Sequence, residues 1–178
     1  YFGQDLFGYE MDYLELTELD LRNNLLKKFE FFSKLIQLFK IDLRFNQINE
    51  LKTFEFDAIL NYLYLENNKL IEITIYTFQN FFRFMYVINL SYNQIEKIES
   101  YSFYSVCQVS LLDLSHNSLK KFENNSFIGL YHLKKLILNS NLIEFIQTEL
   151  FHPLNSIIFI DLEDNRIRDI QDFSFQNQ

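Results

Sequence analysis

The chain has 178 residues, a formal net charge of −8 at neutral pH and one cysteine, Cys107. This length is sufficient for one domain with a sizeable core. The negative charge argues against nucleic acid as a partner, because binding a phosphate backbone needs a basic surface. No window approaches the run of about 18 apolar residues that a membrane span requires, so we expect no membrane insertion by this segment. One cysteine excludes an internal disulfide, and no spacing of His and Cys fits a metal cluster.

One pattern recurs along the chain: apolar, two variable, apolar, variable, Leu, two variable, Asn, variable, apolar. In chain order its copies are LTELDLRNNLL from Leu16, LFKIDLRFNQI from Leu38, LNYLYLENNKL from Leu60, MYVINLSYNQI from Met85, VSLLDLSHNSL from Val109, LKKLILNSNLI from Leu133 and IIFIDLEDNRI from Ile157. The asparagines stand 22 to 25 residues apart, at Asn24, Asn46, Asn68, Asn93, Asn117, Asn141 and Asn165. Chance does not keep seven asparagines in this frame. We therefore predict seven repeats over residues 16–178, with residues 1–15 as the tail of a preceding repeat or an N-terminal flank.

Each copy is expected to form a short strand, because the apolar–x–Leu alternation has the period of two of a strand with one buried face. The strands would stack as a parallel sheet spaced about 4.8 Å apart, and each unit would bury its apolar edge only against its neighbours. The repeated Asn is expected to donate to carbonyls of its own turn and of the adjacent unit. A phenylalanine closes each unit on the far side: Phe32, Phe54, Phe78, Phe103, Phe127, Phe151 and Phe175. Asp57 replaces an apolar residue, which predicts a looser turn after Phe54.

These repeats resemble the leucine-rich repeat family, and more closely its "typical" 24-residue subfamily. The resemblance covers about Leu16 to Phe175 and implies an α/β-type solenoid. It would be a right-handed superhelix with a parallel β-sheet on its concave side and an irregular or short helical convex side. It also implies a protein or peptide ligand on the concave face and an extracellular or cell-surface location, as in Toll-like receptors and adhesion proteins. Because the chain lacks the cysteine-rich caps of such relatives, we expect an uncapped fragment whose bared end units favour self-association.

The variable positions of each strand should stack into columns on the concave face. In this arrangement the middle of the face lacks charge, while both ends carry it. The middle is then a cluster of apolar and aromatic side chains, predicted here to bind the ligand: Phe45, Tyr62, Tyr64, Val87, Tyr92 and Leu111. Aromatic anchors at the centre of a concave patch are common binding hot spots. The alternative is that these aromatics only reflect a genome rich in A and T, and that the column of aspartates beside them only solvates the sheet.

Two glycosylation sequons occur, Asn89-Leu90-Ser91 and Asn124-Asn125-Ser126. Asn124 falls on the return side of its unit, where a glycan would be harmless. Asn89 falls on the concave face beside the tyrosines, so a glycan there would cover part of the predicted ligand site. The two hypotheses about this face therefore compete.

No set of residues supports catalysis or a cofactor. The three histidines (His116, His132 and His152) occupy unlike positions in different units, and no nucleophile accompanies them. The three glycines are too scattered for a phosphate-binding loop. We expect a non-enzymatic binding module, most simply the ligand-recognition segment of an extracellular receptor or adhesion protein. An intracellular, cytoplasmic scaffold or regulatory subunit is the first alternative, and a structural spacer or self-assembling solenoid is the second.

Overall fold

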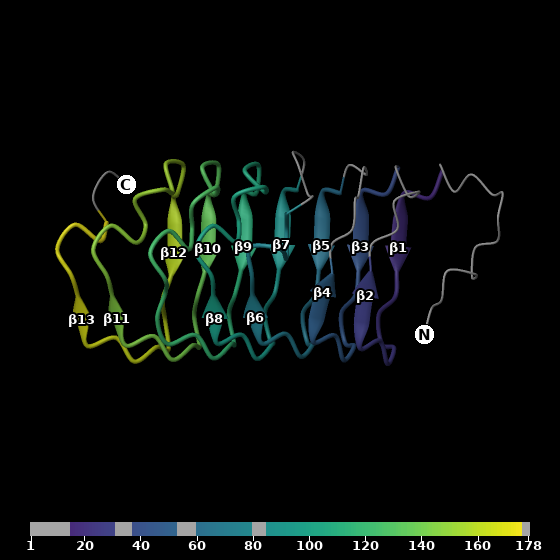
Figure 1. Cartoon of the computed structure of the whole chain (residues 1–178), viewed down its shortest axis with the longest axis horizontal. Helices are drawn as coiled ribbons and strands as arrows, with labels where there is room; N and C mark the ends of the chain where they lie inside the picture. Colours follow the sequence, from purple (N-terminus) through teal and green to yellow (C-terminus); the bar gives the residue numbers. More distant parts are fainter. Residues whose placement is uncertain (1–14, 31–36, 53–59, 80–84, 176–178) are drawn as a thin grey trace.

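The computed structural model describes residues 15–30, 37–52, 60–79 and 85–175, which wind as a solenoid of parallel strands (Figure 1). The predicted parallel solenoid is thus confirmed. Its main sheet has seven strands in the order β1-β3-β5-β7-β9-β10-β12, one from each predicted unit. These strands are β1 (Glu18–Asp20), β3 (Lys40–Asp42), β5 (Tyr62–Tyr64), β7 (Val87–Asn89), β9 (Leu111–Asp113), β10 (Lys135–Ile137) and β12 (Phe159–Asp161).

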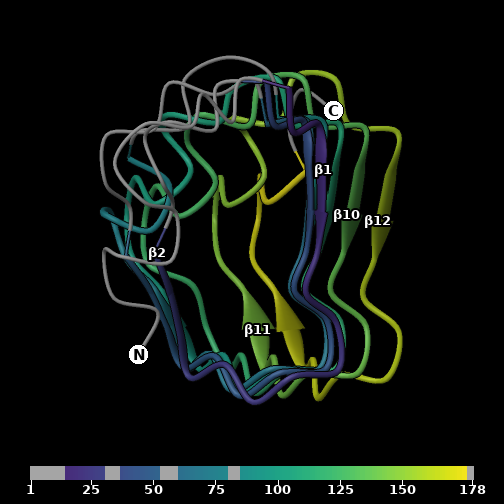
Figure 2. The same cartoon turned by 90° about the vertical axis from the view of Figure 1, so that its right-hand side faces the viewer.

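Every neighbouring pair in the main sheet has the same register, so equivalent residues of successive units stand side by side. The central residues run Leu19, Ile41, Leu63, Ile88, Leu112, Leu136 and Ile160. Those of the five inner strands are completely buried. The residues on either side of each centre point to the opposite face, as the alternation of a strand requires. Viewed along the stack, the strands of this sheet line one side of each coil (Figure 2).

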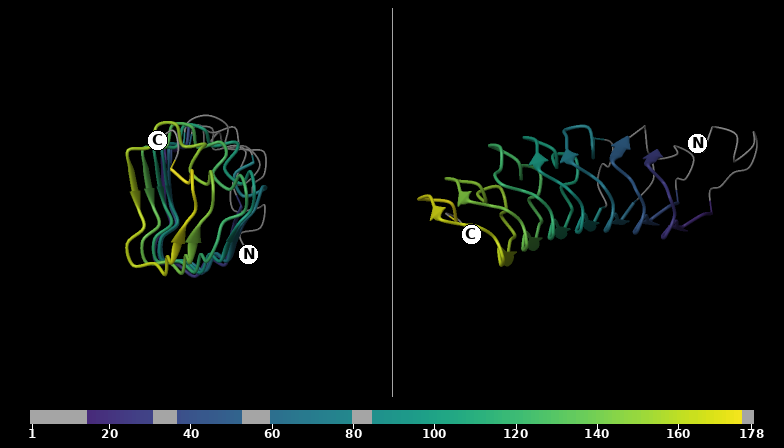
Figure 3. Two further views of the ribbon diagram at one scale, coloured as in Figure 1. Left: turned by 90° about the vertical axis from the view of Figure 1, so that its left-hand side faces the viewer. Right: turned by 90° about the horizontal axis from the view of Figure 1, so that it is seen from below.

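The other side of the coil is made of turns and three two-stranded ribbons. The ribbons pair β2 (Lys28–Glu30) with β4 (Glu50–Lys52), β6 (Glu72–Ile73) with β8 (Lys97–Ile98), and β11 (Phe145–Ile146) with β13 (Asp169–Ile170). The stack bends so that the seven-stranded sheet lies along the inner, concave edge (Figure 3).

The helical part of the expected α/β-type solenoid is absent from the residues that the structure describes. The convex side there is irregular instead. Tyr101, Asn125, Glu149 and Phe173 each have φ between 58° and 65°. A right-handed helix cannot continue through a residue in this left-handed region, so the return segments form turns. In the same residues, no helix is long and apolar enough to cross a membrane.

Phenylalanine rings form the convex half of the core. Phe78 stacks on Phe103 with centroids 5.5 Å apart, and Phe151 lies 6.0 Å from Phe127 and 5.1 Å from Phe175. The first four rings are at most 1% exposed, and burying such a ring contributes about 1.5–3 kcal/mol. Phe32 and Phe54, and the turn at Asp57, lie outside the described residues.

Candidate ligand-binding face

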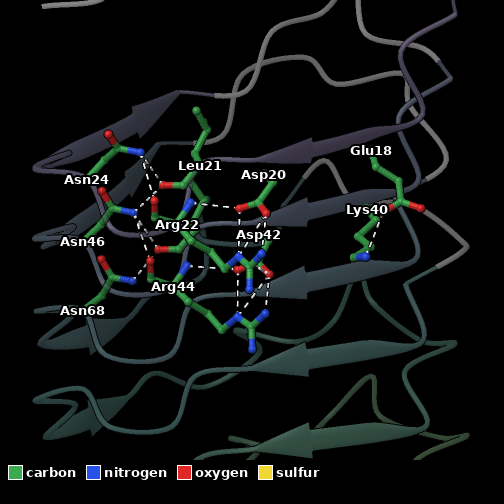
Figure 4. Close-up of polar contacts among 11 residues, drawn as sticks. Glu18, Asp20, Leu21, Arg22, Asn24, Lys40, Asp42, Arg44, Asn46 and Asn68 are labelled. Carbon is green, nitrogen blue, oxygen red and sulfur yellow. Dashed lines mark hydrogen bonds and ion pairs between the residues drawn. The ribbon is translucent and has the colours of Figure 1, made fainter.

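A ladder of asparagine side chains fixes the turn after each strand of the main sheet. In a typical unit, Nδ2 of Asn68 donates to the carbonyl oxygen of Leu43 in the preceding unit and to that of Leu65 in its own, both at 3.0 Å. Its Oδ1 accepts from the backbone N–H of Ile48 at 2.9 Å. Equivalent bonds are made by Asn46, Asn93, Asn117, Asn141 and Asn165. Among the described residues, Asn24 donates only to carbonyls of its own turn (Figure 4).

The turn forces the residue before each of these asparagines into the left-handed region. These residues have φ between 51° and 58°: Asn23, Phe45, Asn67, Tyr92, His116, Ser140 and Asp164. Bulky residues rarely adopt this conformation, which costs of the order of 1–2 kcal/mol. Backbone hydrogen bonds between units hold them there: the N–H of Phe45 donates to the main-chain carbonyl oxygen of Glu66 at 3.1 Å, and that of Tyr92 to the main-chain carbonyl oxygen of Ser115 at 3.0 Å. Asparagine adopts the left-handed conformation more readily than bulky residues do, so Phe45 and Tyr92 are unusual at this position.

The six residues of the predicted ligand site, called the concave patch below, occupy neighbouring strands and turns. Tyr62, Val87 and Leu111 are paired in register across β5, β7 and β9. Tyr64 stacks on Tyr62 with centroids 6.5 Å apart. The remaining two, Phe45 and Tyr92, lie in the turns that follow β3 and β7 and are 51% and 52% exposed. Tyr92 stacks on His116 with centroids 4.1 Å apart. The patch is therefore continuous along the sheet, with its most exposed rings beside it.

Ion pairs fill the concave face at the N-terminal end of the sheet (Figure 4). Lys40 binds Glu18 at 2.8 Å, while Arg22 and Arg44 bind Asp20 and Asp42, each at 2.6 Å. The hydrogen bond from Arg22 holds the pKa of Asp20 at about 2.

The guanidinium of Arg44 also lies 5.6 Å from the ring centroid of Tyr64, which joins this polar cluster to the concave patch. Together with Leu19, these side chains line a hollow of about 380 Å³. Its three cations are all matched by carboxylates, so the hollow presents little positive charge.

Glu66 lies in the middle of the face, so the prediction that this middle lacks charge is wrong. Its Oε1 accepts from Nδ2 of Asn89 at 2.7 Å. Its Oε2 has no solvent contact, and none of the residues that the structure describes forms a hydrogen bond with it. Burial raises the pKa of Glu66 to about 7, which the hydrogen bond from its own backbone N–H and the charge of Arg44 oppose only in part.

The two sequons stand in different environments. The side chain of Asn89 donates to Glu66 and accepts from the N–H of Ser91 at 3.0 Å, and Ser91 is 4% exposed. Asn124 is exposed on a convex turn. The hydroxyl of Ser126 in that sequon is buried and donates to the carbonyls of Ile98 and Glu123. A glycan at Asn89 would disturb the sheet face, whereas one at Asn124 would point to solvent.

A second set of polar contacts, on the convex side, was missed from the sequence. The hydroxyls of Ser102, Ser126 and Ser174 each donate to a carbonyl of the preceding unit, at 3.0 to 3.3 Å. The signal was available, because each serine stands nine residues after a ladder asparagine. Among the described residues, no group of His, Cys, Asp and Glu is placed to hold a metal ion.

Comparison with known proteins agrees with this geometry. The chain matches the leucine-rich repeat family model at residues 58–119, 83–139 and 107–167. The structure resembles TLR13, as seen in a crystal structure of the TLR13–ssRNA13 complex, with a TM-score of 0.80 and 32% identity. That match covers 86% of this chain and 22% of TLR13.

The structure also resembles an internalin (inlF) from Listeria monocytogenes str. 4b F2365, with a TM-score of 0.65 and 20% identity. That match covers 92% of this chain and 46% of the internalin, so this chain spans less than half of either neighbour. A search of curated proteins finds no match. Since the three family matches together span residues 58–167, more than half of its length, the chain belongs to the leucine-rich repeat family.

Proposed function

We propose that this chain is a protein-binding module and that its concave patch contacts the ligand. The observation that carries the proposal is the placement of Phe45 and Tyr92. Both are large and half exposed, and both occupy a left-handed position that a smaller Asn, Ser or Asp fills in four of the other five units. Strained positions of this kind concentrate at functional sites. Rigid aromatic side chains supply much of the binding energy of protein interfaces.

The partner proposed is a protein or peptide rather than RNA, although TLR13 was crystallised in a complex with ssRNA13. The cations at the N-terminal end of the face are paired with carboxylates. The opposite end carries Asp161, Glu163 and Asp164, which would repel a phosphate backbone. Tyrosine and phenylalanine can also stack on bases, so the charge of the face is what favours a protein.

The proposed setting is an extracellular receptor or adhesion protein. The likeness to TLR13 and the exposed sequon at Asn124 support this setting. A glycan at Asn124 would distinguish this setting from that of a cytoplasmic scaffold, because only proteins in the secretory pathway receive such a glycan. Contact of a partner with the concave patch would separate a binding module from a structural spacer.

Site-specific photo-crosslinking tests the binding face. Benzoylphenylalanine is introduced into the full-length protein at Tyr92, and in a control at Tyr104, which lies on a convex turn and is 63% exposed. Irradiation in cells that make the protein should give a covalent adduct from position 92 and none from position 104. An adduct from position 104 alone, or none from position 92, would contradict the proposal.

A further inference from the structure

Neighbouring residues form a hydrogen bond with only one of the two carboxyl oxygens of Glu66 in the described part of the chain. The one neighbouring side chain of the described residues that donates to this carboxyl group is Asn89 in the next unit, which gives Oε1 a short hydrogen bond. Oε2 is sealed from solvent and has no hydrogen-bond partner among the described residues. An ionised carboxylate is stabilised by several donors, whereas a neutral carboxyl tolerates burial more readily. The site is therefore built more for the neutral form than for the charged one.

The charged and titratable groups around Glu66 come from several units. Asp42 and Asp113 both disfavour its ionised form, and burial does so more strongly. Arg44 favours ionisation, but its guanidinium is bound to Asp42 and lies over the ring of Tyr64. Tyr64, the last residue of β5, is partly buried and stands two residues before Glu66. Within the part of the chain that the structure describes, neither Tyr64 nor any other neighbour donates a hydrogen bond to Oε2.

A partner lying on the concave patch would shift the equilibrium between the charged and neutral forms of Glu66 toward the neutral form. Because Oε2 is enclosed, a ligand group on the surface cannot donate to it without moving the side chain. Covering Tyr64, which interacts electrostatically with Glu66, would instead exclude more water from around that carboxyl group. Removing water disfavours the charged form of a carboxyl group.

We propose that the concave patch binds an uncharged, apolar segment of a protein partner, and that Glu66 is protonated in the complex. This proposal rests on the proposed function, since it concerns the same face. A basic segment would have the opposite effect, because a lysine or arginine beside the carboxylate would release the proton. The direction of the pH dependence therefore reports the chemistry of the partner.

The expected size follows from the titration of Glu66. With a pKa of about 7, about nine-tenths of the carboxyl is neutral at pH 6 and about one-tenth at pH 8. When only one form is competent to bind, the apparent affinity scales with its population. Binding should then be up to about tenfold tighter at pH 6 than at pH 8.

The test uses the full-length protein with benzoylphenylalanine at Tyr92 as the probe, irradiated at pH 6 and at pH 8 in extracts of the cells that make it. The adduct yield should be several-fold higher at pH 6. Glu66→Gln, a mimic of the neutral form, should give the higher yield at both values. Glu163→Gln changes the equivalent position of the last unit, outside the patch, and should keep the pH dependence of the unchanged protein.

The outcomes separate the two proposals. Adducts whose yield does not depend on pH, or that form better at pH 8 in a manner lost in Glu66→Gln, would overturn the apolar partner and the protonation of Glu66 while leaving the binding face in place. Dependence on pH that persists in Glu66→Gln would assign the proton to another group and overturn the role of Glu66. Absence of any adduct at either pH, in all variants, would overturn the proposed function itself.

Discussion

Replacing one ladder asparagine by aspartate tests what holds the units together. In Asn93, Nδ2 donates to the carbonyls of Leu65 and Leu90 at 3.0 Å and to that of Ser91 at 3.2 Å. Its Oδ1 accepts from the N–H of Leu70 at 3.0 Å. Asn93→Asp has nearly the same shape and keeps this acceptor. It loses both N–H donors and places a carboxylate against three carbonyl oxygens.

The cost is set by the buried groups left without partners. Each unsatisfied buried carbonyl costs about 1–3 kcal/mol, so Asn93→Asp should lower the free energy of unfolding by about 3 kcal/mol or more at neutral pH. At about 2–4 °C per kcal/mol for a chain of this length, the melting temperature should fall by about 6–12 °C. Burial raises the pKa of the introduced carboxyl. The loss should therefore shrink as pH falls and a proton restores one donor.

Thermal unfolding followed by circular dichroism at pH 7 and pH 4 measures both effects. The matched control is Asn24→Asp, because Asn24 is exposed and, within the described part of the chain, donates only to the carbonyls of Leu21 and Arg22 in its own turn. This change should cost less than about 1 kcal/mol. Equal losses for the two variants, or a loss below about 1 kcal/mol for Asn93→Asp, would refute the role assigned to the ladder.

Three further predictions follow from the surface. Because the folded state holds the pKa of Glu66 above its unfolded value, stability from this group is present at low pH and declines as pH rises from about 4.5 to about 7. Glu66→Gln should then raise the free energy of unfolding by about 1 kcal/mol at pH 8, after discounting for partial exposure, and leave it unchanged at pH 4. Secreted full-length protein should lose glycan mass in Asn124→Gln and not in Asn89→Gln, as intact-mass measurement would show. The separate chain should self-associate through its last unit, where Ile158 is 75% and Phe173 is 61% exposed; a sedimentation coefficient that stays constant with concentration would argue against this.

The repeat pattern predicted the sheet because every unit has the same order of apolar and variable positions. Leu63, Ile88 and Leu112 are fully buried and alternate with partly buried residues, and this alternation fixes which face is buried. Asn68 and its equivalents recur at one position, so their contacts follow from the stacking.

The features that the sequence did not predict depend on contacts between units. The left-handed conformation of Tyr92 is imposed by a backbone hydrogen bond to Ser115 of the next unit, and no glycine marks it. Tyr101 lies in the left-handed region on the convex side in the same unmarked way, so the sequence could not decide between an irregular and a short helical convex side. The burial of Glu66 depends on side chains of neighbouring units, whereas the repeat pattern marks its position only as variable.

The composition of the adduct formed at position 92 tests the central claim most directly. Full-length protein with benzoylphenylalanine at Tyr92 is irradiated in cells, purified under denaturing conditions and divided for treatment with ribonuclease or protease, followed by mass spectrometry. A concave patch that binds a protein predicts an adduct that ribonuclease leaves intact and that yields peptides of a second polypeptide joined to position 92. An adduct that ribonuclease removes would show that this face binds RNA, and would contradict the account.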